Sequence, residues 1–185
     1  PAIVAGKPDA GPLIKLITPD ESQKSPTAQF VRITNHGIKQ ILSLAEVQVF
    51  SGETNSALQG TATQHSTAFG GPPEYAIDGN TDGTFTNKSV THTATVDNPW
   101  WELDLGKLQQ VDKIVLWNRL EAPERLSGFT VELLDADRQT VMTRHFDSQP
   151  SPSLEIATDN TRGVAAMPQD EPPLALQEVR LIRQW

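Results

Sequence analysis

The chain has 185 residues, 37% of them hydrophobic and 21% charged, which is ordinary for one globular domain with a single core. A formal net charge of -8 without a basic cluster argues against binding to nucleic acid or anionic membranes, where Lys and Arg must neutralise phosphates. We also expect no membrane insertion, because no apolar run reaches the length of a spanning helix. The lack of cysteine excludes disulfides, thiolate metal ligands and a thiol nucleophile in this chain.

Short β-rich stretches recur along most of the chain. Residues 1–28 are rich in Pro, Asp, Lys and Ser and predict an N-terminal arm or linker before one domain at 29–185. The expected strands are Phe30–Ile33, Leu42–Phe50, Trp100–Leu105, Lys113–Trp117, Gly128–Leu134, Thr140–Phe146 and Val179–Ile182. This spacing of strands and turn signals predicts an all-β fold, an antiparallel β-sandwich.

Two polar segments interrupt the strands. Residues 55–98 are rich in Gly, Thr, Asn and Asp and are too long for an ordinary connection, which is typical of segments that carry function. Residues 147–176 are Pro-rich and polar and predict a surface loop. At the start of the Trp100 stretch, alternation should send one of Trp100 and Trp101 into the core and the other outward.

The acidic loop 76–83, with the sequence AIDGNTDG, is a candidate cation site. Calcium takes about six to eight oxygen ligands, and carboxylate, amide and backbone carbonyl groups around tight glycine turns can supply most of them. It is not an EF-hand, because the spacing does not run to a Glu at the twelfth position. The alternative is a plain turn, since Asp and Asn side chains commonly bond their own backbone in such sequences.

Several motif blocks occur in a characteristic order: Ala62–Thr67, Ala76–Asn80, Ser89–Thr93, Asn98–Gly106, Asn118–Arg119 and Glu124–Phe129. Taken together, they resemble F-type lectins, a branch of the discoidin-like (coagulation-factor type C), galactose-binding-like sandwiches. The resemblance covers roughly residues 55–146 and implies a jelly-roll-like sandwich. It also implies that Ca²⁺ is held by the side chains of Asp78, Asn80 and Ser89, with the Tyr75 carbonyl as a further ligand.

The last calcium ligand of this family is a Glu in a strand near the C-terminus. Here the similar pattern lies in Ser43–Val49, before the core motif, so the chain resembles a circularly permuted member with Glu46 as that ligand. Residues 177–181 carry a competing copy of the pattern at the usual terminal place. Without an ion, Glu46 would be a solvent-facing residue of an alternating strand.

His92, Arg119 and Arg125 form the candidate sugar site, since a His nitrogen and forked guanidinium donors can bind adjacent hydroxyls directionally. In F-type lectins a His and two Arg at similar spacing bind fucose, and Phe85 lies at the matching loop position. The sequence departs from the family because Arg125 comes one position early and Glu121 replaces an Asp. The alternatives are ion pairs of Arg119 with Glu121 or Glu124, and a Phe85 that only anchors its loop.

These patterns favour a binding module over an enzyme. No paired-carboxylate, serine-hydrolase, phosphate-loop or HExxH motif stands out. We expect a calcium-stabilised carbohydrate-binding module for a fucose-like or related neutral sugar, presented by a glycan on a surface or polysaccharide. Residues 1–26 faintly resemble the end of c-type cytochrome modules, which suggests an exported multidomain protein that is secreted, periplasmic or at the cell surface. The alternative is a discoidin-like structural or protein-interaction domain that binds no sugar.

Overall fold

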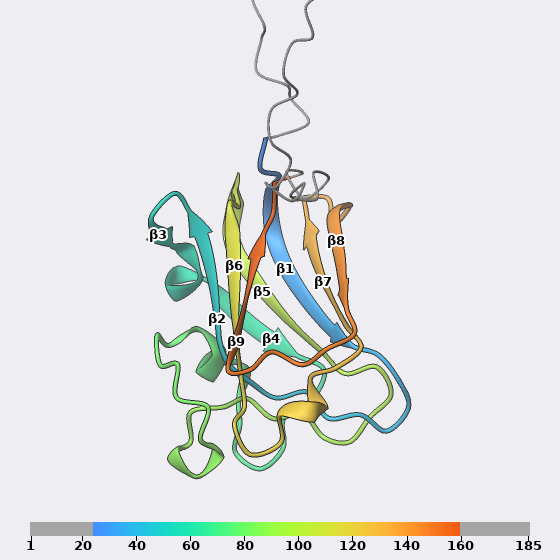
Figure 1. The fold of residues 1–185 in the computed structure, drawn as a ribbon. Coiled ribbons are helices and arrows are strands. Elements are labelled where there is room, and N and C mark those ends of the chain that lie inside the picture. The colour runs from blue at the N-terminus through green and yellow to red at the C-terminus, as the bar shows by residue number, and fades with distance from the viewer. Residues whose placement is uncertain (1–23, 160–185) are drawn as a thin grey trace, which may run out of the picture.

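The computed structural model describes residues 24–159, which form two antiparallel sheets packed face to face (Figure 1). This confirms the predicted β-sandwich. The first sheet has the order β4-β5-β1-β7-β8, with β4 (Thr61–Gln64), β5 (Trp100–Gln110), β1 (Thr27–Asn35), β7 (Phe129–Leu134) and β8 (Thr140–Phe146). The second has the order β3-β2-β6-β9, with β3 (Thr54–Asn55), β2 (Leu44–Ser51), β6 (Lys113–Asn118) and β9 (Ser153–Ala157). Short 3₁₀ turns lie between strands at η2 (Ser56–Gln59), η3 (Pro73–Ile77), η4 (Phe85–Asn87) and η5 (Pro123–Arg125).

Alternating side chains from both sheets build the core. On β6, Ile114 and Leu116 are fully buried while their neighbours along the strand are partly exposed. On β5, Trp101 is fully buried, and Trp100 faces outward, where the Arg32 guanidinium lies 4.3 Å from its ring centroid. The prediction that one of the two Trp residues is core is therefore confirmed.

The indole of Trp101 also fixes the turn that leads into the acidic loop. Its Nε1 donates to the Pro73 carbonyl at 3.0 Å, so a core residue of β5 holds the start of η3. Because η3 runs directly into Asp78, this buried bond positions the acidic loop against the sandwich.

The loops after β1, β4 and β6 gather at one end of the sandwich, at the bottom of Figure 1. They carry the residues predicted to bind a ligand, and β2 packs against η3, which leads into the acidic loop. The expected strand 42–50 is thus a member of the second sheet, paired with β6 and β3. Its place in the family's own strand order stays a prediction.

Several expectations about the secondary structure need correction. Residues 147–176 were expected as a surface loop, but β9 lies within them and pairs with β6. Its signal is weak because Ile156 is its only buried residue. The polar segment 55–98 likewise contains β4, which pairs with β5. The expected strand Val179–Ile182 lies outside the described residues, and the boundary between an arm at 1–28 and a domain at 29–185 stays a prediction, although β1 already begins at Thr27.

A membrane-spanning helix, long and apolar enough to cross a bilayer, is not found among residues 24–159.

We expect Trp101→Phe to lower the free energy of unfolding by about 1–3 kcal/mol, because it leaves the Pro73 carbonyl without its donor and opens space in the core. Trp117→Phe is the matched control, since the Trp117 Nε1 reaches Gln48 only at 3.4 Å on the outer face of β6. Urea denaturation of both variants measures the difference. Equal destabilisation would show that the Trp101 bond does not hold η3.

Candidate functional site

The segment 91–93 is fixed to the sandwich as an additional strand-like pairing. Thr91 and Thr93 donate their N–H groups to the carbonyls of Leu44 and Leu42, at 2.8 and 3.0 Å. Their hydroxyls accept in return from the N–H groups of Leu44 and Leu42, both at 2.9 Å. These four hydrogen bonds satisfy six backbone groups in a buried setting, and His92 lies between the two threonines that form them.

His92 is only 3% exposed, and the protonation state of its ring follows from its contacts. Its Nδ1 lies 2.8 Å from the Thr93 carbonyl, which can only accept, so Nδ1 carries the proton. Burial lowers the pKa of His92, although the bond to Thr93 opposes the shift, and the positive charges of Arg119 and Arg125 lower it further. At neutral pH the imidazole is therefore uncharged, and its Nε2 presents a lone pair to a ligand.

Two aromatic rings flank His92. The Phe69 and Phe85 centroids lie 4.9 and 5.7 Å from the His92 centroid, both edge to face. Phe69 is 78% exposed and has a φ of 51°, a left-handed conformation that is unfavourable for a bulky residue. Sequence reasoning missed Phe69. The only local signal in the sequence was the Gly70-Gly71 pair that follows it. In the structure, a Cβ at Gly71 would lie 2.6 Å from the backbone nitrogen of His92.

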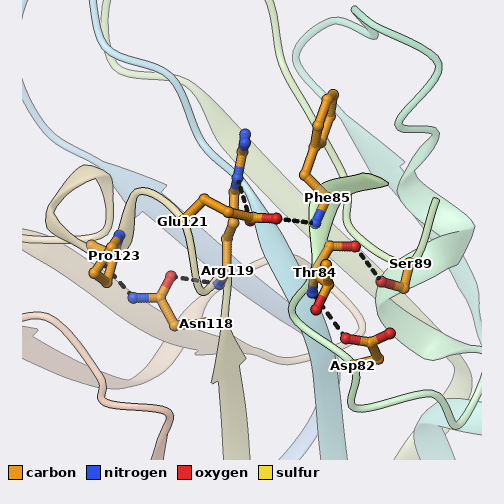
Figure 2. Close-up of polar contacts among 8 residues, drawn as sticks. All are labelled: Asp82, Thr84, Phe85, Ser89, Asn118, Arg119, Glu121 and Pro123. Carbon is orange, nitrogen blue, oxygen red and sulfur yellow. Dashed lines mark hydrogen bonds and ion pairs between the residues drawn. The ribbon is translucent and has the colours of Figure 1, made fainter. Parts of the chain in front are cut away.

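Arg119 reaches the same place from the loop after β6. Its Cζ lies 4.2 Å from the Phe85 ring centroid, and its Nε donates to Glu121 Oε2 at 3.1 Å. The other carboxylate oxygen, Oε1, accepts from the Phe85 N–H at 2.8 Å, so Glu121 stands between the two residues (Figure 2). Partial burial acts to raise the pKa of Glu121, but backbone N–H groups and Arg119 lower it on balance. The Arg119–Glu121 ion pair, given as an alternative to a sugar contact, therefore exists, and it leaves the Nη atoms of Arg119 unbonded within the described chain.

Arg125 has an anchored backbone and an unpaired side chain. Its carbonyl accepts from the Asn35 side-chain amide at 2.6 Å, which ties η5 to the end of β1. Within residues 24–159 its guanidinium forms no hydrogen bond or ion pair. Its positive charge contributes to the lowered pKa of His92. The donors of its guanidinium fork are available to a ligand.

The structure thus brings Arg119, Phe85 and His92 into contact and adds Phe69, whereas the Arg125 side chain forms no hydrogen bond, ion pair or ring contact with them in residues 24–159. The set offers guanidinium donors, one neutral imidazole acceptor and apolar ring faces. A small ligand with adjacent hydroxyls and an apolar edge satisfies all three kinds of group.

Glu46 has a different environment from the solvent-facing one that strand alternation allowed. It is fully buried, because a β-bulge between Leu44 and Glu46 interrupts the alternation of β2 and the acidic loop covers this face. Its Oε1 accepts from the Gly79 N–H at 3.1 Å, whereas its Oε2 is buried without a partner. The alternative of an alternating strand with a solvent-facing Glu46 is therefore wrong at the start of β2, where residues 44–47 are all buried.

The buried carboxylate of Glu46 is energetically unfavourable as an anion. Burial raises its pKa to about 7, and although the Gly79 N–H lowers it, the negative charge of Asp78 raises it again. An unpartnered buried oxygen beside a second carboxylate is a setting that a bound hard cation would stabilise. The residues therefore fit a calcium ion on this observation.

The rest of the acidic loop forms consecutive turns. Asp78, Asn80 and Asp82 each accept, through Oδ1, the backbone N–H two residues further on, at 2.8, 3.0 and 2.9 Å. This is the turn chemistry given as the alternative to a cation site. Ser89 is buried, and its hydroxyl donates to the Thr84 carbonyl at 3.0 Å (Figure 2). These bonds occupy one oxygen of each acidic side chain and leave the second carboxylate oxygen of Asp78 for other partners.

The predicted cation set stays a prediction. Among residues 24–159, no group of three or more His, Cys, Asp or Glu is arranged to hold a metal ion. The predicted set has only two carboxylates, Glu46 and Asp78. It is completed by the Asn80 amide, the Ser89 hydroxyl and the carbonyl of Tyr75 in η3, and such neutral oxygens are ordinary calcium ligands.

In a chelator, we expect Glu46 to lower the stability of the wild type relative to Glu46→Gln as the pH rises from about 4.5 to above 7, because the folded state holds a Glu46 proton that the unfolded chain releases. Glu46→Gln mimics the protonated form and removes this dependence. At pH 8 the variant should be the more stable protein, by up to roughly 3 kcal/mol, and at pH 4 the two should be similar. Denaturant unfolding at both pH values measures it, and parallel pH profiles would contradict the assignment.

Comparison with known proteins agrees with this geometry. The model of the NedA-like, galactose-binding domain family matches residues 75–165. Fucolectin-5 of Anguilla japonica is 35% identical over 102 residues, which cover 48% of this chain and 54% of that protein. The fucolectin of Anguilla anguilla is 33% identical over 87 residues, covering 44% and 55%. The chain thus spans about half the length of the curated relatives it matches.

Solved structures extend the match to three dimensions. The lectin domain of lectinolysin, complexed with Lewis B antigen, is 42% identical with a TM-score of 0.55, over 58% of this chain and 78% of that one. A fucose-binding module of Streptococcus pneumoniae is 37% identical with a TM-score of 0.55, over 58% and 77%. The chain therefore belongs to the discoidin-like, galactose-binding-like family of β-sandwich domains, in the branch of the F-type lectins.

Proposed function

We propose that this domain is a carbohydrate-binding module that takes a fucose-like neutral sugar at its loop end. The observation that carries the proposal is the cluster of Arg119, Phe85 and His92. The unpaired guanidinium of Arg125, whose charge contributes to the lowered pKa of His92, would complete it. The names of the relatives support it, because they include fucolectins and fucose-binding modules. The proposal makes the domain a binding protein and assigns it no catalytic residue.

Each group has a distinct part in recognition. The guanidinium groups of Arg119 and Arg125 donate hydrogen bonds to hydroxyl and ring oxygens of the sugar. Because a guanidinium has no acceptor, these groups require acceptors on the ligand. The unprotonated Nε2 of His92 accepts a hydrogen bond from a sugar hydroxyl. The site therefore recognises neighbouring hydroxyls both as hydrogen-bond acceptors and as hydrogen-bond donors. The rings of Phe69 and Phe85 supply apolar surface for a C–H face or for the methyl group of a deoxysugar.

We further propose that calcium stabilises the acidic loop. Glu46, Asp78, Asn80, Ser89 and the Tyr75 carbonyl would hold it. The ion would supply positive charge that offsets two neighbouring carboxylates in a buried place. The orphaned Glu46 Oε2 supports this proposal.

The setting of the domain follows from the same proposal. A single exposed site for a small polar ligand binds weakly, because every hydroxyl must exchange water for protein, so binding to a surface glycan or polysaccharide would depend on several sites acting together. This suits an exported multidomain protein that acts in the periplasm, at the cell surface or outside the cell.

Replacing Arg125 tests the sugar site with little structural side effect, since its guanidinium has no partner among the described residues. We expect Arg125→Ala to weaken binding of methyl α-L-fucoside at least about tenfold, the loss of one or two charge-assisted hydrogen bonds. Its melting temperature should remain near that of the wild type. Calorimetry and melting curves measure both.

Arg144→Ala on β8 is the matched control and should leave binding unchanged. His92→Ala should also lose binding, but with some loss of stability because its ring is buried. If the wild type binds no sugar on a glycan array at any calcium concentration, the structural or protein-interaction alternative stands instead.

Calcium binding to the folded state alone should raise stability by mass action, by about 2.7 kcal/mol at a concentration a hundred times the dissociation constant. We therefore expect the melting temperature to rise with added calcium and to fall again with a chelator. Glu46→Gln and Asp78→Asn should each abolish most of this response. Asp97→Asn, in another loop, serves as the control, and a calcium response that survives in Glu46→Gln would remove Glu46 from the site.

A further inference from the structure

We propose that Glu121 couples cation binding in the acidic loop to ligand binding by Arg119, so that each event strengthens the other. This inference rests on the proposed function and adds a means of regulating the same site. It arises from the position of the Glu121 carboxylate, which contacts the loop that holds the predicted cation ligands and the arginine that faces the ligand.

The first half of the link lies within the acidic loop. The Ser89 hydroxyl donates to the Thr84 carbonyl at 3.0 Å, and the Thr84 N–H donates to Asp82 at 2.9 Å. Phe85 follows Thr84 directly and begins η4. The Ser89 hydroxyl can coordinate a cation through its oxygen lone pairs and still donate its hydrogen bond to the Thr84 carbonyl. The position of Ser89 therefore fixes the peptide that carries the Phe85 N–H.

The second half joins this peptide to the loop after β6. Glu121 accepts from the Phe85 N–H at 2.8 Å and from Arg119 Nε at 3.1 Å (Figure 2). Beside this bridge, the Leu120 N–H donates to the Gly83 carbonyl at 2.9 Å. A Cβ at Gly83 would lie 2.5 Å from the Asn118 carbonyl, so the two loops are in backbone contact and no side chain separates them.

These contacts make residues 83–85 and 118–121 one mechanical unit. A cation held by Ser89 would restrain the hydroxyl that donates to the Thr84 carbonyl, and with it the peptide that carries the Phe85 N–H. Without this restraint, the peptide of Phe85 is held less firmly. Ligand binding must then restrict the motion of Phe85 and of the Arg119 guanidinium, which costs conformational entropy. A loop already ordered by a cation removes that cost, which gives positive cooperativity without a new contact. Reciprocity requires that the ligand tighten cation binding by the same factor.

Calorimetry on the full chain tests this link. We expect methyl α-L-fucoside to bind at least about fivefold more tightly in saturating calcium than in chelator, within the usual range for coupled sites. Calcium should bind more tightly by the same factor in the presence of the fucoside. In Glu121→Ala the factor should approach one, while calcium still raises the melting temperature.

Two further variants make the result specific to the bridge. Glu124→Ala changes an exposed carboxylate in the same loop and should keep the wild-type coupling. Glu121→Gln keeps an acceptor for the Phe85 N–H but loses the charge facing Arg119, and should couple partially if Glu121→Ala does not fold. Equal fucoside affinity with and without calcium in the wild type, or full coupling in Glu121→Ala, overturns the proposal.

A readout without sugar separates this inference from the proposed function. The Arg119 Nε–H signal in a ¹⁵N correlation spectrum should shift when calcium is added to the wild type, and should not respond in Glu121→Ala. If no sugar binds under any condition but this signal responds, the proposed function fails and the link stands. If the fucoside binds and the signal ignores calcium, the link fails and the function stands.

Discussion

The burial of the Glu46 carboxylate against the acidic loop is the constraint on which this end of the sandwich depends. A carboxylate in a water-free place is unfavourable unless it is protonated, hydrogen-bonded or paired with positive charge. Here one oxygen accepts from Gly79 and the other has no partner, which is reflected in a pKa raised to about 7. This side chain fastens a strand of the second sheet to the loop after η3, so the state of one ionisable group decides how firmly that loop is held.

In the candidate ligand site, the backbone of the key residues is fixed by hydrogen bonds, while polar groups of their side chains remain available to a ligand. His92 lies in a segment whose neighbours on both sides pair with Leu42 and Leu44, and the Arg125 carbonyl is tied to Asn35 at the end of β1. The His92 Nε2 and the Arg125 guanidinium have no hydrogen bond within the described chain. Arg119 is intermediate, because Glu121 holds its Nε and leaves the outer nitrogens available. Such an arrangement orients donors and acceptors before a ligand arrives, which lowers the cost of binding.

Residue patterns and tertiary contacts differ in what they reveal about Glu121, Glu46 and Phe69. The sequence suggests an ion pair between Arg119 and Glu121, but the bond from Glu121 to the Phe85 N–H joins segments 36 residues apart and has no sequence signal. For Glu46, strand alternation allowed an exposed side chain, and only the bulge and the covering loop bury it. Phe69 resembled any loop residue, because its importance comes from a left-handed backbone and a ring placed against His92.

The sequence by itself determined the fold class and most of the strands, because alternating burial and turn residues are local properties that a chain carries along its length. It also determined the chemistry available at the loop end, since the order of the motif blocks identifies the family and the residue types limit the interactions. The tertiary structure alone decided that Glu46 meets Asp78 and that Arg119, Phe85 and His92 share one place. These contacts join residues from separate strands and loops, and their distances depend on sheet register and loop packing, which no single segment encodes.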